Sequence, residues 1–141
     1  MNHRILGIDY GDSRIGIAIS DPFAWVASPL CVVDGKQGLK KAVAEIASIV
    51  DKNDVTKIVI GYPLNMNGTA GPRVHRTERF IEEFGILRPD VEIIKWDERL
   101  TTVAADRMMR ELGISQRQKG VSDKLAASFI LKGYLDSMKD K

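Results

Sequence analysis

The stretch that most constrains the fold lies near the start of the chain, at residues 4–20. Two short apolar runs rich in β-branched residues flank a turn at residues 11–13, which is the pattern of a β-hairpin. Both faces of each run are apolar, so we expect the hairpin to lie inside a sheet that is covered on two sides. The hairpin therefore predicts a layered α/β protein.

Asp9 is the exception within this hairpin. It falls on the same face of its strand as Ile5 and Gly7, where a carboxylate is costly to bury unless a cation or hydrogen-bond donors meet it. One interpretation is an aspartate that caps its own turn. The other is a carboxylate held out to a metal ion or to a phosphate-bearing substrate, and the hairpin alone leaves both open.

Length and composition narrow the class of protein. The 141 residues predict one domain, over residues 1–141, with a sizeable core. The net charge of +2 permits a nucleic-acid partner without arguing for one. Cys31 is the only cysteine, which excludes an internal disulfide and a cysteine-rich zinc site and indicates a reducing compartment. No signal peptide or membrane-spanning run is visible, so we expect a cytoplasmic protein with His3 and His75 on its surface.

The rest of the chain alternates between strand and helix patterns. A third strand is expected at about residues 25–33, at a sheet edge because Pro29 lacks an N–H. Right-handed crossovers make the first, fourth and fifth strands parallel, so we expect a mixed five-stranded sheet with helices on both faces. The later elements are predicted as a helix from 39 to about 51–53, a strand at 57–62, a helix at 73–84, a strand at 91–96, a helix at 100–112 and a helix from Ser122, fraying from Ser137.

Carboxylates gather where the parallel strands end, which is where open α/β sheets bind ligands. Asp9 lies at that end of the first strand, and Asp97 and Glu98 at that end of the fifth. Alternation puts Asp97 and Glu98 on opposite faces, so only one of them can turn toward Asp9. Asp123, predicted as the first residue of the last helix, is a third candidate, although the helix dipole favours an acidic residue there without any function.

Clustered carboxylates suit a hard cation. Mg²⁺ binds through one or two carboxylates plus substrate phosphates, and paired ions support phosphodiester hydrolysis. An alternative is an ATPase, because a strand ending in Asp-x-Gly resembles the first phosphate loop of actin, Hsp70 and the sugar kinases. The chain is short for that duplicated fold and has no Walker-type Gly-Lys-Ser/Thr motif. A nucleic-acid-binding module without catalysis would leave the acidic positions unexplained.

Four blocks of sequence, in order, resemble those of the YqgF/RuvX family. The similarity covers essentially the whole chain. It implies a ribonuclease H-like α/β fold, with a five-stranded mixed sheet of order 3-2-1-4-5, and a relation to the RuvC Holliday-junction resolvases. The blocks are Gly7–Gly11 with Arg14–Ala18, Gly61–Thr69, Trp96–Thr102 and Lys119–Ala127.

The resemblance also implies roles for particular residues. Asp9, Glu98 and Asp123 would be the catalytic carboxylates and the ligands of Mg²⁺ or Mn²⁺, which favours Glu98 over Asp97. The loop that contains Asn65, Asn67 and Thr69 would flank the site and contact the substrate. We further expect cations on segments that could rim the site to hold phosphates; these are Arg73, Arg76, Arg99, Arg110, Arg117 and Lys119.

The family is associated with processing the 5′ end of the 16S ribosomal RNA precursor, and many of its members are labelled junction resolvases. We therefore expect a metal-dependent endonuclease that acts on RNA in preference to DNA, with ribosome-assembly factors as candidate partners. A monomer or weak homodimer is expected, with no membrane association. The alternative is a Holliday junction resolvase, which should dimerise in order to place two sites across a symmetric junction.

Overall fold

The structure is a computed structural model, and it describes residues 3–65, 67–100 and 119–139. Five strands in these residues form one mixed sheet of order β3-β2-β1-β4-β5, in which β1, β4 and β5 are parallel and β2 and β3 are antiparallel to their neighbours. The predicted order and directions are confirmed. The strands are β1 (Arg4–Tyr10), β2 (Arg14–Ser20), β3 (Ala27–Asp34), β4 (Val55–Tyr62) and β5 (Glu92–Asp97).

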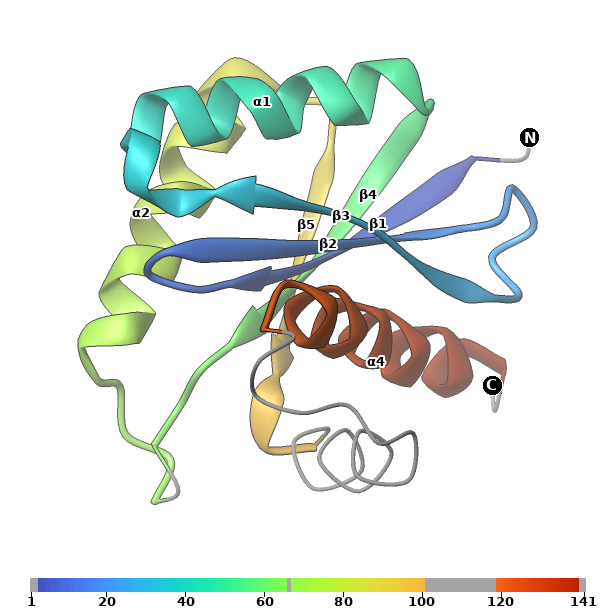
Figure 1. Ribbon diagram of the computed structural model, residues 1–141. Coiled ribbons are helices and arrows are strands. Elements are labelled where there is room, and N and C mark those ends of the chain that lie inside the picture. The colour runs from blue at the N-terminus through green and yellow to red at the C-terminus, as the bar shows by residue number, and fades with distance from the viewer. Residues whose placement is uncertain (1–2, 66, 101–118, 140–141) are drawn as a thin grey trace.

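Helices cover both faces of the sheet, with α1 and α2 on one face and α4 on the other (Figure 1). The helix predicted at residues 100–112 lies mostly outside the described residues. Within the described ranges, no helix is both long and apolar enough to cross a membrane. The helical elements are α1 (Leu39–Lys52), α2 (Pro72–Leu87), α4 (Lys119–Lys139) and the short 3₁₀ helices η1 (Gly35–Gln37) and η2 (Glu98–Leu100).

The helix α4 lies close against β1 and β2, because glycines stand where side chains would block it. A methyl group at Gly7 would lie 2.8 Å from the Cβ of Leu131 and 2.9 Å from the carbonyl oxygen of Ala127. A methyl group at Gly16 would overlap the backbone carbonyl of Asp123. The missing side chains therefore set how near the helix comes to the sheet.

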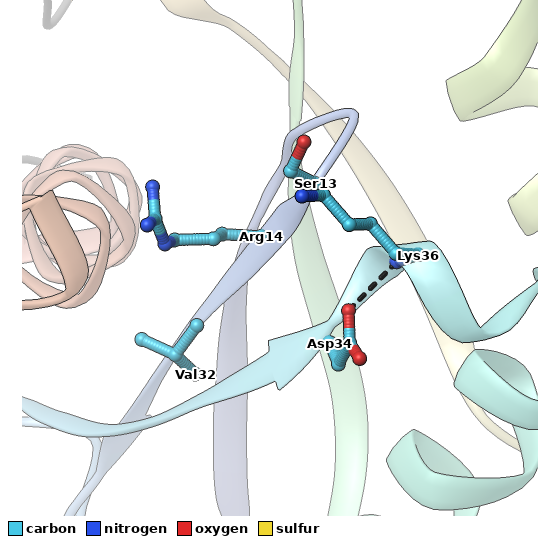
Figure 2. Close-up of a pocket in the computed structure, with 5 residues that line it drawn as sticks. All are labelled: Ser13, Arg14, Val32, Asp34 and Lys36. Carbon is cyan, nitrogen blue, oxygen red and sulfur yellow. Dashed lines mark hydrogen bonds between the residues drawn. The ribbon is translucent and has the colours of Figure 1, made fainter.

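The edge strand β3 begins at Ala27, two residues later than predicted. The carboxylate of Asp21 accepts hydrogen bonds from the backbone N–H groups of Phe23, Trp25 and Val26, and this holds residues 21–26 as a loop rather than as a strand. At its other end β3 leads into η1, where the carboxylate of Asp34 accepts a hydrogen bond of 2.8 Å from the backbone N–H of Lys36 (Figure 2).

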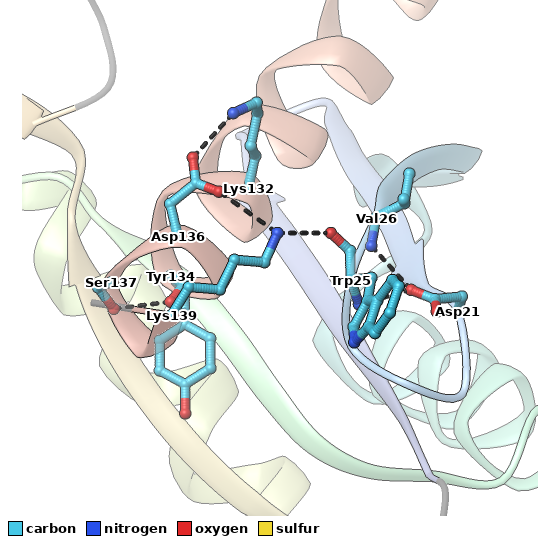
Figure 3. Close-up of polar contacts among 8 residues, drawn as sticks. All are labelled: Asp21, Trp25, Val26, Lys132, Tyr134, Asp136, Ser137 and Lys139. Carbon is cyan, nitrogen blue, oxygen red and sulfur yellow. Dashed lines mark hydrogen bonds and ion pairs between the residues drawn. The ribbon is translucent and has the colours of Figure 1, made fainter. Parts of the chain in front are cut away.

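Both ends of α4 differ from the prediction. The helix begins at Lys119 rather than at Ser122, so Asp123 is not its first residue. An N-cap preference contributes only about 1 kcal/mol, so Ser122 does not by itself fix where the helix begins. At the other end the helix continues to Lys139 instead of fraying from Ser137, and there the Lys139 ammonium donates a 3.0 Å hydrogen bond to the carbonyl of Trp25 (Figure 3).

Candidate functional site

Asp9 and Glu98 meet at the carboxyl ends of parallel strands. Asp9 is the second-last residue of β1, and Glu98 follows β5 directly. The strand β4 lies between them, and its Gly61 leaves the space that the Glu98 side chain occupies, since a methyl group at Gly61 would overlap the Glu98 carboxylate. Both acidic residues are partly buried.

The two carboxyl groups interact directly. Burial, the negative charge of Glu98 and a hydrogen bond between the two side chains together raise the pKa of Asp9 from 3.8 to about 7, while the charge of Arg73 opposes the rise. Ionising both carboxyl groups at this separation in a partly buried environment is energetically unfavourable. The pair therefore holds a proton up to near-neutral pH unless another positive charge neutralises it.

Asp97, the other acidic residue at the end of β5, belongs to the opposite face. It pairs in register with Tyr62 of β4, one position beyond the pairing of Gly61 with Trp96. Its carboxylate forms an ion pair of 2.7 Å with Arg99, and this interaction lowers its pKa. The geometry thus puts Glu98 and not Asp97 beside Asp9, as the resemblance implied.

Asp123 reaches this edge through its backbone. Its carbonyl lies against Gly16 of β2, and Gly16 is the residue that pairs with Asp9 across the hairpin. Asp123 is partly buried and is not among the groups that shift the pKa of Asp9. Within the described part of the chain, no three histidine, cysteine or acidic side chains are grouped so that they could hold a metal ion. The ligand role of Asp123 stays a prediction.

The loop between β4 and α2 is closed by its own hydrogen bonds. The backbone N–H of Asn65 donates to the carbonyl of Thr69 at 2.9 Å, and the Thr69 hydroxyl donates to the Asn67 side chain at 2.6 Å. A methyl group at Gly68 would come within 3.5 Å of the Arg99 guanidinium. The structure therefore brings the predicted loop residues and Arg99 to one place beside η2.

The predicted cations are divided between several positions. Arg73, exposed in the first turn of α2, is near enough to Asp9 to lower its pKa. Arg76 forms an ion pair with Asp12 in the β1–β2 turn. Arg110 and Arg117 lie outside the described residues, as does the side chain of Lys119. His3 and His75 are exposed, as expected.

Sequence reasoning missed a hollow of about 370 Å³ that lies beside the β1–β2 turn, between the start of β2 and the end of β3. Its basic side chains are those of Arg14 and Lys36 (Figure 2). Alternation along β2 could have indicated Arg14, because it stands two residues before Gly16, the partner of Asp9, and so on the same face. The residues that line the hollow are Ser13, Arg14, Val32, Asp34 and Lys36.

Comparisons with known proteins agree with this architecture. Residues 3–137 match the family described as "RuvX: Holliday junction resolvase". Two bacterial relatives named "Putative pre-16S rRNA nuclease" are 58% identical over 134 residues, from Ruminiclostridium cellulolyticum, and 49% identical over 135 residues, from Acetivibrio thermocellus. The first alignment covers 94% of each chain, and the second covers 95% of this chain and 96% of the relative.

Two solved structures align with most of this chain. The structure of T. thermophilus RuvC in complex with a Holliday junction substrate aligns with a TM-score of 0.63 at 14% identity, covering 99% of this chain and 97% of that one. The yeast mitochondrial Holliday junction resolvase Ydc2 aligns with a TM-score of 0.55 at 15% identity, covering 95% and 78%. At these identities the likeness concerns the fold alone.

The class defined by the fold and the relatives is that of nucleases with the ribonuclease H-like fold. The chain belongs to the RuvX family. The predicted family, the fold and the expectation of a nuclease are thereby confirmed.

Proposed function

We propose that this protein is a metal-dependent endonuclease that cleaves the 16S ribosomal RNA precursor in the cytoplasm, with its reacting phosphate beside Asp9 and Glu98. The observation that carries the proposal is the contact between these two carboxyl groups at the carboxyl ends of β1 and β5, where burial and the neighbouring Glu98 together raise the pKa of Asp9 to about 7. Such a pair is unfavourable for folding, so a functional reason for keeping it is the simplest account.

The donor set fits a hard divalent cation. Asp9 and Glu98 offer oxygen ligands, and their mutual repulsion is what a bound cation would relieve. When bound, Mg²⁺ or Mn²⁺ would supply an activated water and neutralise charge on the leaving oxygen. Asp123 would be the third ligand, from the helix that Gly16 admits close to the sheet.

Residues around the pair would hold the substrate. Arg73 already acts electrostatically on Asp9, and it would balance the charge of a phosphate at the same place. The closed loop of Asn65, Asn67 and Thr69, together with Arg99, would form the wall on the β5 side. Arg76, held by Asp12, would keep the β1–β2 turn against α2, and Arg117 and Lys119 would add phosphate contacts.

The substrate assignment follows the named relatives, which share up to 58% of their residues with this chain. The test is a cleavage assay that compares precursor 16S RNA, unrelated single-stranded RNA and DNA, and four-way DNA junctions, with and without Mg²⁺ or Mn²⁺. We expect metal-dependent cleavage of the precursor near its mature 5′ end. Equal cleavage of every single-stranded RNA would contradict the assignment of precursor 16S RNA as the substrate. Cleavage in chelator would contradict the requirement for a metal ion.

The site is tested with Asp9→Asn and Glu98→Gln. Loss of several kcal/mol of transition-state stabilisation should lower the cleavage rate at least about a hundredfold. Glu92→Gln, an exposed position at the other end of β5, is the matched control and should leave the rate unchanged. Metal should also raise the melting temperature of the wild type more than that of Asp9→Asn, because a ligand of the native state alone stabilises it. Wild-type cleavage by both variants would refute the site.

A second candidate is junction resolution, which the family description and the likeness to RuvC favour. Paired symmetric nicks in a four-way junction, made by a tight dimer in sedimentation, would support it over the RNA substrate. We expect instead a monomer or a weak dimer. Binding of nucleic acid without cleavage of any substrate would indicate that the protein is a nucleic-acid-binding module without catalytic activity.

A further inference from the structure

We propose that the hollow beside the β1–β2 turn is a binding subsite for backbone phosphates of a nucleic-acid strand, with Arg14 and Lys36 as its cationic contacts. This inference rests on the proposed function, because it supposes that the nucleic-acid strand passes Asp9 at the carboxyl end of β1. It adds a second flank to the site, on the side of β2 and β3, opposite the flank formed by α2 and the β4–α2 loop.

The position of the hollow relative to the carboxylate pair follows from strand register. Asp9 pairs with Gly16 across the hairpin, and Arg14 stands two residues before Gly16, beyond the last paired position of β1. Asp9, Gly16 and Arg14 therefore share the face of the sheet on which α4 lies. Because Arg14 lies beyond the paired end of β1, it is placed to hold a neighbouring phosphate rather than the reacting one.

The chemistry of the hollow suits a phosphodiester. Arg14 extends from β2 on the side of α4, while Lys36 reaches from η1 toward Ser13 (Figure 2). The Ser13 hydroxyl can add a neutral donor. One acidic side chain, that of Asp34, also lines the hollow, but one of its oxygens accepts the backbone N–H of Lys36. The two cations thus outnumber the single carboxylate.

The platform beneath these side chains is preorganised. The backbone N–H of Gly35 donates to the carbonyl of Ser13 at 2.9 Å, which ties the start of η1 to the β1–β2 turn. A methyl group at Gly35 would lie only 3.0 Å from the carbonyl of Asp12. Arg14 and Lys36 therefore stand on two segments held in direct contact, so binding need not order the backbone.

Arg14 and Lys36 are both available to a ligand. Each is exposed, and neither forms an ion pair with any described residue. Lys41 and Lys52 of α1 share these properties, so what points to phosphate contacts is that Arg14 and Lys36 line one hollow beside the proposed nuclease site.

The test measures binding apart from cleavage. Fluorescence anisotropy in chelator gives the affinity for a labelled single strand of RNA, and for DNA of the same sequence, between about 50 and 500 mM salt. The variant is Arg14→Gln with Lys36→Gln. The control is Lys41→Gln with Lys52→Gln, which removes the same charge from exposed positions of α1. Charge-preserving Arg14→Lys with Lys36→Arg tests rescue, and melting curves establish that each variant is folded.

We expect the double glutamine variant to reduce the slope of log affinity against log salt by about 1.4, because each phosphate that is no longer neutralised lowers the slope by about 0.7. The reduction should be the same for RNA and DNA, the control should keep the wild-type slope, and the charge-preserving variant should restore most of it. A wild-type slope in a folded double glutamine variant would overturn the subsite, as would a reduction confined to RNA. Failure of the proposed function has a different signature, namely wild-type protein that binds with this slope and cleaves nothing.

Discussion

The two faces of the sheet are built in opposite ways. On the face of α1 and α2, large side chains such as Leu6, Ile8 and Phe80 fill the space completely. On the face of α4, the equivalent strand positions include Gly7, Gly16 and Gly61, and the space that they leave admits a helix backbone and a carboxylate. The face of α1 and α2 holds the larger hydrophobic core, whereas the face of α4 combines a smaller apolar cluster with space left by glycines.

This difference explains why the site lies where it does. A carboxyl group next to a continuous apolar core would find no space and no solvent. Glycines in strand interiors lower intrinsic stability, and the face of α1 and α2 compensates by burying most of the large side chains. The face of α1 and α2 therefore contributes most of the stability, whereas the face of α4 holds the candidate site. The following variants test this division.

The largest effect on stability should come from the apolar face. Phe80 is fully buried, with its ring centroid 5.1 Å from that of Tyr10 and 5.7 Å from that of Phe84. Phe80→Ala should lower the free energy of unfolding by about 3–5 kcal/mol, as measured by urea denaturation. Well below its melting temperature the variant should keep the wild-type cleavage rate per folded molecule. A proportionate loss of rate there would mean that the two faces are not separate.

Gly16→Ala should damage both folding and function. The added methyl group would overlap the backbone carbonyl of Asp123, which cannot swing aside as the end of a side chain can. We expect a cost of about 1–3 kcal/mol and a cleavage rate reduced beyond what the unfolded fraction explains, because the start of α4 must move away from the sheet. Unchanged activity in this variant would show that the position of α4 is not critical for the site.

The carboxylate pair should make the metal-free protein sensitive to pH. The pKa of Asp9 in the folded protein, about 7, lies above its ordinary value of 3.8. Between these values the native state keeps a proton that the unfolded chain has released, so the wild type loses stability as the pH rises through this range. Asp9→Asn removes the effect. In chelator its melting temperature should exceed that of the wild type above about pH 7, and the difference should shrink toward about pH 4. A variant that melts below the wild type at both extremes would mark Asp9 as a structural turn residue.

The smallest effect on stability is expected at Gly85, a glycine whose missing side chain admits no neighbouring group. Gly85 lies inside α2, and a methyl group there would meet no atom within 4 Å. Gly85→Ala should therefore stabilise the protein by about 0.5–1 kcal/mol, which a shift in the urea midpoint would detect, and should leave cleavage unchanged. Destabilisation by Gly85→Ala would weaken the distinction drawn between glycines that face α4 and glycines that do not.

Local sequence patterns were sufficient for much of the fold. The hairpin of residues 4–20, the helix from Leu39 and the strand before Pro63 follow from periodicity and turn residues. Element ends were less certain. Asp21 held residues 21–26 out of β3 through three backbone hydrogen bonds, and α4 began before the N-cap signal at Ser122. These are contacts made in the folded chain, which local propensity does not report.

By itself, the sequence determined the class of protein. The order of strands and helices, the alternation that separates Asp97 from Glu98 and the four family blocks are all properties of the linear chain. Only the tertiary structure decided that Asp9 and Glu98 share a hydrogen bond, that Asp123 meets β2 through its backbone, and that Arg14 and Lys36 line one hollow. The reason is physical. Register and periodicity assign a residue to a face of the sheet, but the distances between side chains on that face depend on how closely α4 packs against the strands. Here that packing depends on Gly7, Gly16 and Gly61.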